Sequence, residues 1–324
     1  MHPGEIWNGR SLGARVARGA LYPGSLLYAA GWQGYLTLYR TGLKRPTEPH
    51  KPVLCIGNLV VGGGGKSPLT LHLAALIKDM GRTVVVSASG YGSPRSEAAT
   101  LAPEGPLDPK AWGDEPAMMR WLQPDLPLIV GRRRVLSAQI CHERYPDAVL
   151  LMDDGFQHLP LKKHLTIVLD PPNPQNPMCL PAGPYREPRS NRRRADLVLP
   201  GQFSVEQSPL RFVGPNGETA DPQNPSVLCA LGRPERFLEA ICQSGLTPDP
   251  KIVLPDHDSL TAGTLLDKIP RGRPVVVTAK DWVKLRERGD VGSRQFVIAL
   301  QSVTVQPAAA FRDWIQSRLD GTSA

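Results

Sequence analysis

The sequence is poor in cysteine and aromatic residues, and these shortages exclude several classes of protein. Five cysteines are scattered through 324 residues without a Cys-x-x-Cys pair, so we expect reduced, mostly buried thiols and neither a zinc site nor a disulfide framework. Aromatic residues make up only 6% of the chain and are not interleaved with a basic stretch, which argues against a nucleic-acid groove. The net charge of +8 still favours an anionic partner, either phospholipid headgroups or a phosphorylated substrate.

The N-terminal segment carries no charged residue from position 20 to position 39, and arginines or lysines lie on both sides of it. A spanning helix needs about 20 apolar residues to cross about 30 Å of hydrocarbon. We expect Pro23 to interrupt the segment, which leaves a helix rising only about 24 Å. Its Tyr and Trp side chains favour the headgroup level. Residues 1–45 are therefore predicted to form a membrane-associated helix that lies in or dips into the bilayer; the alternatives are a core helix of a soluble lobe and a cleaved signal peptide.

A glycine-rich loop follows the first apolar run of the chain. Residues 52–57 are predicted to form a buried strand and residues 69–80 a helix, and a glycine loop between the two presents backbone N–H groups to phosphate oxygens. The expected ATP ligands are Gly62, Gly63, Gly64, Gly65, Lys66 and Ser67. Lys66 supplies a positive charge, and the hydroxyl of Ser67 helps to hold Mg²⁺. The strict phosphate-loop pattern needs glycine where this chain has Val60, so a purely structural turn is the alternative.

Short apolar runs alternate with loops and helices along the rest of the chain. Strands are expected at 83–87, 126–130, 147–152 and 165–169, then at 227–231, 251–254, 274–278 and 295–300, with helices at 234–242, 281–287 and 308–319. This alternation predicts an α/β protein with a mostly parallel, P-loop NTPase-like sheet covered on both faces. A core domain is expected at 46–210 and a smaller α/β lobe at 211–324, with the nucleotide at the carboxyl ends of the strands.

Acidic residues and one histidine follow these elements at positions where they can act in phosphoryl transfer. Asp153 and Asp154 end an apolar strand, where an acid can hold Mg²⁺ beside the phosphates or simply form a turn or helix cap. Asp114 precedes an apolar helix, either as its cap or as a general base for an attacking hydroxyl. His257 lies between two aspartates and either tunes a base or is a solvated surface residue. The proline-stiffened segment 180–188 and the arginines after it form either a solvated loop or a site for a phosphate or anionic headgroup.

In this order, the motifs resemble the tetraacyldisaccharide 4'-kinase family of lipid A biosynthesis. The matching segments are 57–59, 61–68, 90–92, 113–116, 153–158, 180–188, 233–237, 255–257 and 280–281. Asp-Asp-Gly-Phe-Gln-His and Leu-Pro-Ala-Gly-Pro are the most specific of them, and the resemblance covers nearly the whole chain. The family's own loop lacks the glycine that is missing at Val60.

The resemblance implies a kinase that uses ATP and Mg²⁺ to phosphorylate the 4'-hydroxyl of a tetraacylated glucosamine disaccharide 1-phosphate, giving lipid IVA. It further implies a position at the cytoplasmic face of the bacterial inner membrane. By the same match, the expected catalytic residues are Asp114 as base, His257 as its partner, Lys66 and Asp154; Ser67 and Asp153 hold the metal, and Arg186 and Glu187 face the substrate.

The chain departs from the family's motifs at Ser89, Arg133 and Ala279, none of which is a proposed catalytic residue. The expected partners are the lipid substrate and an anionic membrane surface, with no nucleic acid and no obligate protein partner. Two other functions are possible for such a chain: a P-loop kinase or ligase acting on a soluble substrate, and a membrane-bound nucleotide switch.

Overall fold

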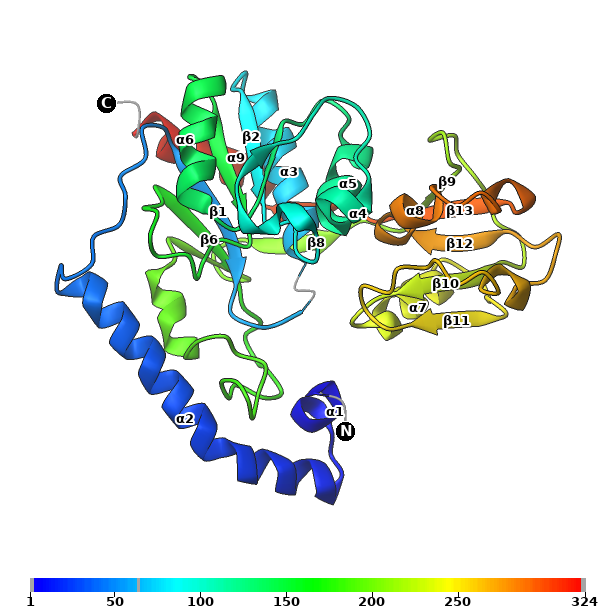
Figure 1. Cartoon of the computed structure of the whole chain (residues 1–324), viewed down its shortest axis with the longest axis horizontal. Helices are drawn as coiled ribbons and strands as arrows, with labels where there is room; N and C mark the ends of the chain where they lie inside the picture. Colours follow the sequence, from blue (N-terminus) through cyan, green and yellow to red (C-terminus); the bar gives the residue numbers. More distant parts are fainter. Residues whose placement is uncertain (1–2, 63–64, 322–324) are drawn as a thin grey trace.

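The structure, a computed structural model, describes residues 3–62 and 65–321 and contains two α/β lobes and a projecting N-terminal helix (Figure 1). The larger lobe is built on a sheet with the strand order β3-β4-β2-β5-β1-β6-β7. Its strands are β1 (Val53–Asn58), β2 (Val84–Ala88), β3 (Thr100–Leu101), β4 (Leu128–Val130), β5 (Val149–Asp153), β6 (Leu165–Leu169) and β7 (Leu197–Leu199). Only β3 is antiparallel to its neighbour. The predicted α/β class and mostly parallel sheet are therefore confirmed.

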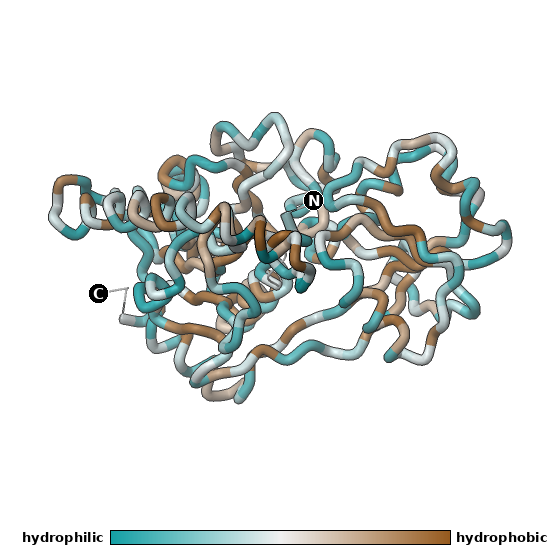
Figure 2. Tube along the Cα trace, turned by 90° about the horizontal axis from the view of Figure 1, so that it is seen from below, coloured by the Kyte–Doolittle hydropathy of each residue, from teal (hydrophilic) through white to brown (hydrophobic). Residues whose placement is uncertain are grey.

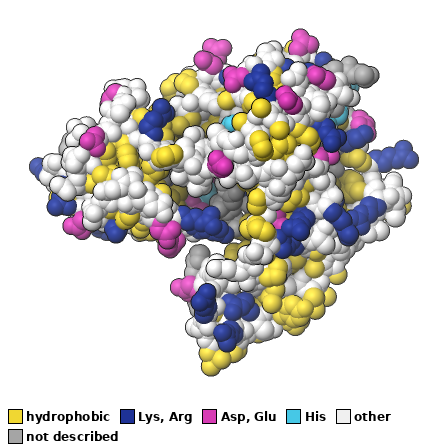
Figure 3. All heavy atoms as spheres, turned by 180° about the vertical axis from the view of Figure 1, so that it is seen from behind, with side chains coloured by type: hydrophobic (Ala, Val, Ile, Leu, Met, Phe, Trp, Pro, Cys, Tyr) yellow, Lys and Arg dark blue, Asp and Glu magenta, His cyan; other side chains and the backbone are white. Residues whose placement is uncertain are grey.

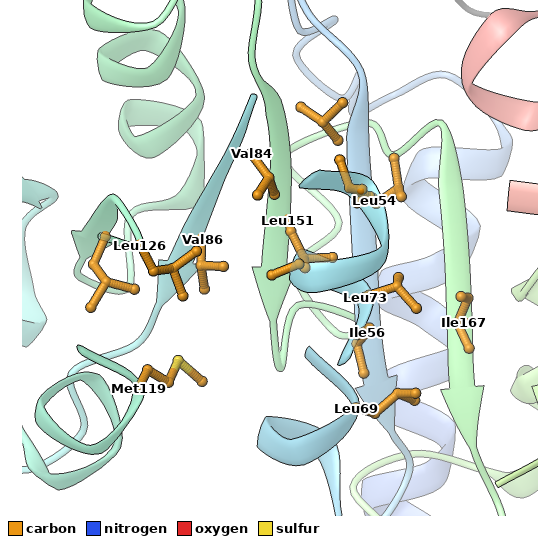
Figure 4. Close-up of a cluster of buried hydrophobic side chains, with 14 of the residues drawn as sticks. Leu54, Ile56, Leu69, Leu73, Val84, Val86, Met119, Leu126, Leu151 and Ile167 are labelled. Carbon is orange, nitrogen blue, oxygen red and sulfur yellow. The ribbon is translucent and has the colours of Figure 1, made fainter. Parts of the chain in front are cut away.

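Helices cover both faces of this sheet, which explains why its strands are apolar without alternation. The helices between these strands in the sequence are α3 (Lys66–Asp79), α4 (Pro109–Trp112), α5 (Asp114–Leu122) and α6 (Arg134–Arg144). Leu54 and Ile56 of β1 pack with Leu73 of α3 on one face (Figure 4). Cys55, between them in sequence, packs with Cys141 of α6 on the other face. All five cysteines are free thiols and four of them are buried, as expected.

Helix α3 begins three residues earlier than the sequence predicts, at Lys66. Pro68 does not prevent this start, because the first N–H groups of a helix have no intrahelical acceptor and a proline there costs no hydrogen bond. The phosphate-loop lysine and serine therefore belong to the first turn of the helix.

The smaller lobe has its own sheet, with the order β11-β10-β12-β13-β9. Its elements are β9 (Arg211–Val213), β10 (Ser226–Ala230), α7 (Pro234–Gln243), β11 (Lys251–Leu254), β12 (Val275–Thr278), α8 (Ala279–Leu285) and β13 (Phe296–Leu300). Short 3₁₀ helices are found at Leu266–Lys268 and Val291–Ser293 in this lobe and at Pro94–Glu97 and Arg189–Arg194 in the larger lobe. Figure 2 shows the hydrophobic residues following the strands inside both lobes.

The last elements of the chain return to the larger lobe. Strand β14 (Val303–Gln306) pairs with β8 (Ser204–Gln207), and α9 (Ala308–Asp320) follows it. Phe311 and Ile315 of α9 share a buried cluster with Leu73 of α3. The expected bounds of the smaller lobe, 211–324, are therefore too wide at the C-terminal end, because β14 and α9 pack against the larger lobe. The sequence shows that α9 has an apolar face but not which sheet covers that face.

Helix α2 (Leu12–Arg40) runs beneath the larger lobe and is preceded by the short helix α1 (Pro3–Asn8) (Figure 1). The expectation that Pro23 interrupts the helix is wrong, since Pro23 lies inside it. A proline leaves the carbonyl four residues earlier without its donor, and here that residue, Gly19, is exposed, so water can replace the donor. The 29 residues of α2 thus form one continuous element.

Hydrophobic side chains and Lys or Arg side chains share the surface of this projection, as Figure 3 shows. Leu12 and Leu27 are 78% and 76% exposed, and Val16 and Leu26 are also exposed. Among residues 3–62 and 65–321, no helix combines the length and the apolar character needed to cross a membrane.

Candidate active site

The phosphate loop joins the carboxyl end of β1 to the first turn of α3. Gly65 is the N-cap of α3 and has φ +75°, and Gly62 has φ +90°, a backbone region that glycine adopts without steric cost. Gly63 and Gly64, which are also expected to bind ATP, lie outside the described residues. Ser67, in the first turn of α3, lies beside Asp153 at the end of β5, so the N-terminus of the helix meets the end of the sheet, an arrangement that suits an anion.

Asp153 lies at the end of β5 beside this helix start. It is buried, and its carboxylate accepts hydrogen bonds from Thr70 Oγ1 at 2.8 Å and Ser67 Oγ at 3.3 Å. Burial, together with the negative charges of Glu115 and Asp154, raises the pKa of Asp153 to about 7. The structure thus brings the two expected metal ligands, Ser67 and Asp153, together at a place where a cation would relieve unfavourable negative charge.

Asp154 has the opposite electrostatic environment. Its carboxylate lies 3.6 Å from Lys66 Nζ and accepts hydrogen bonds from both terminal nitrogens of Arg186, at 2.7 and 3.1 Å. Burial opposes ionisation, but Lys66 and Arg186 outweigh it and hold the pKa of Asp154 below its usual range. Asp154 also has φ +53°, a strained conformation for a residue other than glycine, and such strain often occurs at functional sites.

Asp114 is the first residue of α5 and lies where the two lobes meet. Its Oδ2 is 3.3 Å from Nδ1 of His257 and 3.6 Å from Nζ of Lys284, both of which belong to the smaller lobe. Burial opposes ionisation, yet the hydrogen bond with His257 and the charges of Lys284 and Lys280 hold the pKa of Asp114 below its usual range. The structure therefore brings together the predicted base and its predicted partner, which are 143 residues apart.

The backbone before Asp114 requires glycine. Gly113 has φ +94°, and a Cβ at this position would lie 3.2 Å from the backbone of Gly90. This close approach sets the start of α5 against the turn that carries Tyr91, whose ring is 5.5 Å from that of His257. Asp114, His257, Lys284, Tyr91 and seven neighbours line a cavity of about 200 Å³.

The imidazole ring of His257 lies closer to the carboxylate of Asp114 than to that of Asp256, its neighbour in sequence. Asp256 Oδ1 is 3.9 Å from His257 Nε2 and is held instead by Lys280 Nζ at 3.0 Å. The backbone carbonyl of Asp258 accepts a hydrogen bond from Lys284 Nζ at 2.7 Å. These contacts fix the loop around His257, so that the ring faces the larger lobe.

Arg186 and Glu187 are adjacent in sequence but have different surroundings. Arg186 contacts Asp154 and the side chain of Asn58 at the phosphate-loop end of the sheet. Glu187 is fully buried, accepts a hydrogen bond from Gln157 Nε2 at 3.0 Å and pairs with Arg194. The geometry therefore does not support a substrate-facing position for Glu187, because its carboxylate is satisfied inside the protein.

The donor set fits a magnesium ion that shares its coordination with phosphates. The described residues include no group of three or more His, Cys, Asp or Glu side chains that could hold a metal ion. Mg²⁺ is commonly bound by one or two carboxylates, with water and substrate phosphates as the other ligands, and Asp153 and Ser67 suit that mode.

Several contributors to this site were missed by sequence reasoning. Thr70 follows Ser67 by three residues, so helical spacing could have placed both hydroxyls on one face. Glu115 follows Asp114 in the first turn of α5, and its negative charge helps to raise the pKa of Asp153. No local signal identifies Lys284, because its contact with Asp114 depends on how the lobes pack.

Comparison with known proteins places the chain among lipid kinases. The family model described as tetraacyldisaccharide-1-P 4'-kinase matches residues 17–320. A protein named tetraacyldisaccharide 4'-kinase from Aromatoleum aromaticum is 32% identical over 318 residues, covering 90% of this chain and 91% of its own length. One of the same name from Polaromonas naphthalenivorans is 34% identical, covering 87% and 84%.

A solved structure shares the fold over most of the chain. It is the crystal structure of the "apo" form of LpxK from Aquifex aeolicus in complex with ATP, with a TM-score of 0.81 and 25% identity, and the match covers 94% of this chain and 99% of that one. Because the family match spans nearly all of the sequence and the relatives exceed 30% identity, this chain belongs to the tetraacyldisaccharide-1-P 4'-kinase family.

Proposed function

We propose that this protein transfers the γ-phosphate of ATP to the 4'-hydroxyl of a tetraacylated glucosamine disaccharide 1-phosphate, giving lipid IVA. The observation that carries this proposal is the contact of Asp114 with His257 across the lobes, on a chain in which Lys66, after the glycines of the loop, pairs with Asp154. Membership of the kinase family supports the same reaction.

The larger lobe is suited to hold the phosphate donor. Backbone N–H groups at the start of α3 and the charge of Lys66 would bind the β- and γ-phosphates, while Asp154 and Arg186 hold Lys66 and the strand ends in place. Asp153 and Ser67 would bind Mg²⁺, which supplies charge neutralisation on the phosphates when it is bound. Phosphoryl transfer depends mainly on such positioning and electrostatic stabilisation.

The cleft between the lobes is suited to activate the acceptor. Asp114, kept ionised by its neighbours, can accept the proton of the attacking hydroxyl, and His257 orients the carboxylate through Nδ1. Glu115 lies in the same helix turn and is electrostatically coupled to Asp153. The start of α5 therefore connects the proposed base with the metal-binding side of the site.

The projecting helix α2 is suited to bring the enzyme to a lipid substrate. Its exposed leucines can enter the interfacial region of a bilayer, and Arg10 and Arg15 beside them are exposed and can contact anionic headgroups. We place the protein at the cytoplasmic face of the inner membrane, where ATP is available.

The test is product analysis with purified full-length protein. Incubation with ATP, Mg²⁺ and a tetraacyl disaccharide 1-phosphate should add the mass of one phosphate to the lipid, located at the 4'-position by fragmentation. Asp114→Asn should lower kcat by about 10²- to 10⁴-fold and leave nucleotide binding near that of the wild type. No lipid phosphorylation by the wild type would reject the function, and near-normal turnover by Asp114→Asn would reject the base.

A further inference from the structure

Helix α2 makes a buried polar contact with the segment that leads to Arg186. Ser25 is only 3% exposed, although the residues on either side of it along the helix are exposed. Its hydroxyl donates to the carbonyl of Cys179 at 2.8 Å and accepts from the N–H of Ala182 at 2.9 Å. One side chain of α2 therefore satisfies two backbone groups of this segment.

Two further hydrogen bonds extend this attachment. The hydroxyl of Tyr28, one helical turn after Ser25, donates to the backbone carbonyl of Arg186 at 2.9 Å. Nε1 of Trp7, from α1, donates to the carbonyl of Pro181 at 2.9 Å. The N-terminal helices thus hold the segment at both ends, from position 179 to position 186.

The same segment is bonded on its other side to the start of the glycine loop. The N–H of Arg186 donates to the carbonyl of Leu59 at 2.7 Å, and the N–H of Val61 donates to the carbonyl of Pro184 at 2.9 Å. Between them, Val60 forms an antiparallel bridge with Tyr185. Residues 179–186 therefore lie between α2 and the strand end from which the phosphate loop begins.

The side chains of the segment strengthen this connection. Tyr185 is fully buried and donates its hydroxyl to Asp170 at 2.9 Å, while the guanidinium of Arg186 bonds Asp154 beside Lys66. A shift of the segment would move both the backbone at positions 59–61 and the charge that faces Asp154.

We propose that Ser25 is a positioning residue for the kinase reaction: by holding residues 179–186, it sets the backbone of residues 59–61, where the glycine loop begins, and Arg186 in their working positions. Helix α2 then has a second role, distinct from membrane attachment, in the geometry of the phosphate-donor site. This inference rests on the proposed function, because its kcat is measured in the lipid kinase reaction. Its physical basis is that, without the hydroxyl, two buried backbone groups lose their partners and the segment relaxes to recover them.

The experiment compares Ser25→Val, Ser25→Thr and, as a matched control, Thr37→Val, which removes a hydroxyl that donates to the carbonyl of Gln33 within α2. Ser25→Val should lower kcat by about 10- to 100-fold and weaken binding of a fluorescent ATP analogue several-fold. Its KM for the lipid and its flotation with vesicles should stay within about twofold of wild type. Ser25→Thr keeps the hydroxyl and should restore most of the activity, and Thr37→Val should match the wild type.

Wild-type kcat and nucleotide affinity in Ser25→Val would overturn the proposal, as would a loss confined to lipid KM or flotation. If Ser25→Val does not fold, Tyr28→Phe provides the second variant, since it removes only the bond to the carbonyl of Arg186, and it should lower kcat several-fold. If the wild type phosphorylates no lipid, the proposed function fails separately, and the positioning role is then decided by nucleotide affinity alone.

Discussion

The ionisation of Asp114 depends on a lysine from the other lobe. Lys284 is almost fully buried and lies 3.6 Å from Asp114 and 3.5 Å from Asp281. With His257 and Lys280, it outweighs the effect of burial and lowers the pKa of Asp114. A cation favours the ionised form of a neighbouring carboxyl group, and a general base must be ionised to accept a proton.

Lys284→Met should therefore raise the pKa of Asp114 and shift the acid limb of kcat/KM to higher pH. The pKa of Asp114 rises because the proton that inactivates the base binds more tightly once the nearby positive charge is gone. Lys284→Arg should keep the limb near its wild-type position. The measurement is the pH profile of kcat/KM for lipid phosphorylation, with Lys110→Met as control, because Lys110 is an exposed lysine lining the same cavity. An unchanged limb in Lys284→Met would contradict the electrostatic role.

Candidate site residues could be predicted where the neighbouring sequence indicates their position in the fold. Lys66, Ser67 and Asp153 each follow or end a recognisable strand, so topology alone brings them to one edge of the sheet. The contact between Asp114 and His257 was implied by the family resemblance and not by spacing. Lys284 could not be found in either way, because its role depends on which faces of α5 and α8 pack together.

At the scale of elements, α2 presents apolar side chains that the rest of the described chain does not cover. Burying a leucine side chain in an apolar phase contributes about 1.5–3 kcal/mol. Leu12→Glu combined with Leu27→Glu should therefore reduce partitioning into anionic vesicles by about tenfold or more. Both side chains lie largely exposed on α2, so their replacement should leave ATP-analogue binding unchanged. Flotation against vesicle concentration measures the effect.

The control adds the same two charges at exposed polar positions of the same region, Thr37→Glu with Thr41→Glu. These substitutions remove no apolar surface and should lower partitioning much less. If both double variants float equally, charge and not apolar burial governs attachment, and the proposed role of the leucines is wrong.

The differences between predicted and observed elements have physical causes. The apolar strands are found within two residues of their predicted bounds because burial on both faces leaves an unbroken apolar run. Pro23 was misinterpreted because helix-breaking rules assume that the freed carbonyl stays unsatisfied. Helix α9 was assigned to the wrong lobe because its amphipathic pattern specifies a buried face without naming the partner, here the cluster of Leu73 and Phe203.

At the scale of the whole molecule, the two lobes meet through α5 and α8. Met118 and Trp121 of α5 pack against the buried clusters of both lobes, and Asp114 at the start of the same helix contacts His257 and Lys284. The proposed base and the residue that orients it therefore belong to different lobes. Any change in how the lobes pack alters the contact between the proposed base and its partner as well as the cleft.

This arrangement predicts strong coupling between Asp114 and His257 in a double-mutant cycle. When two residues act as one unit, removing the second costs little once the first is gone. Asp114→Asn alone should lower kcat/KM by about 10²-fold or more. Asp114→Asn combined with His257→Ala should lower kcat/KM little further. Arg82→Ala serves as the control partner, because Arg82 pairs with Asp320 on the far side of the larger lobe and its loss should be additive with His257→Ala. Additive losses in the Asp114–His257 cycle would show that the two side chains act independently, and the contact across the lobes would then have no part in activating the acceptor hydroxyl.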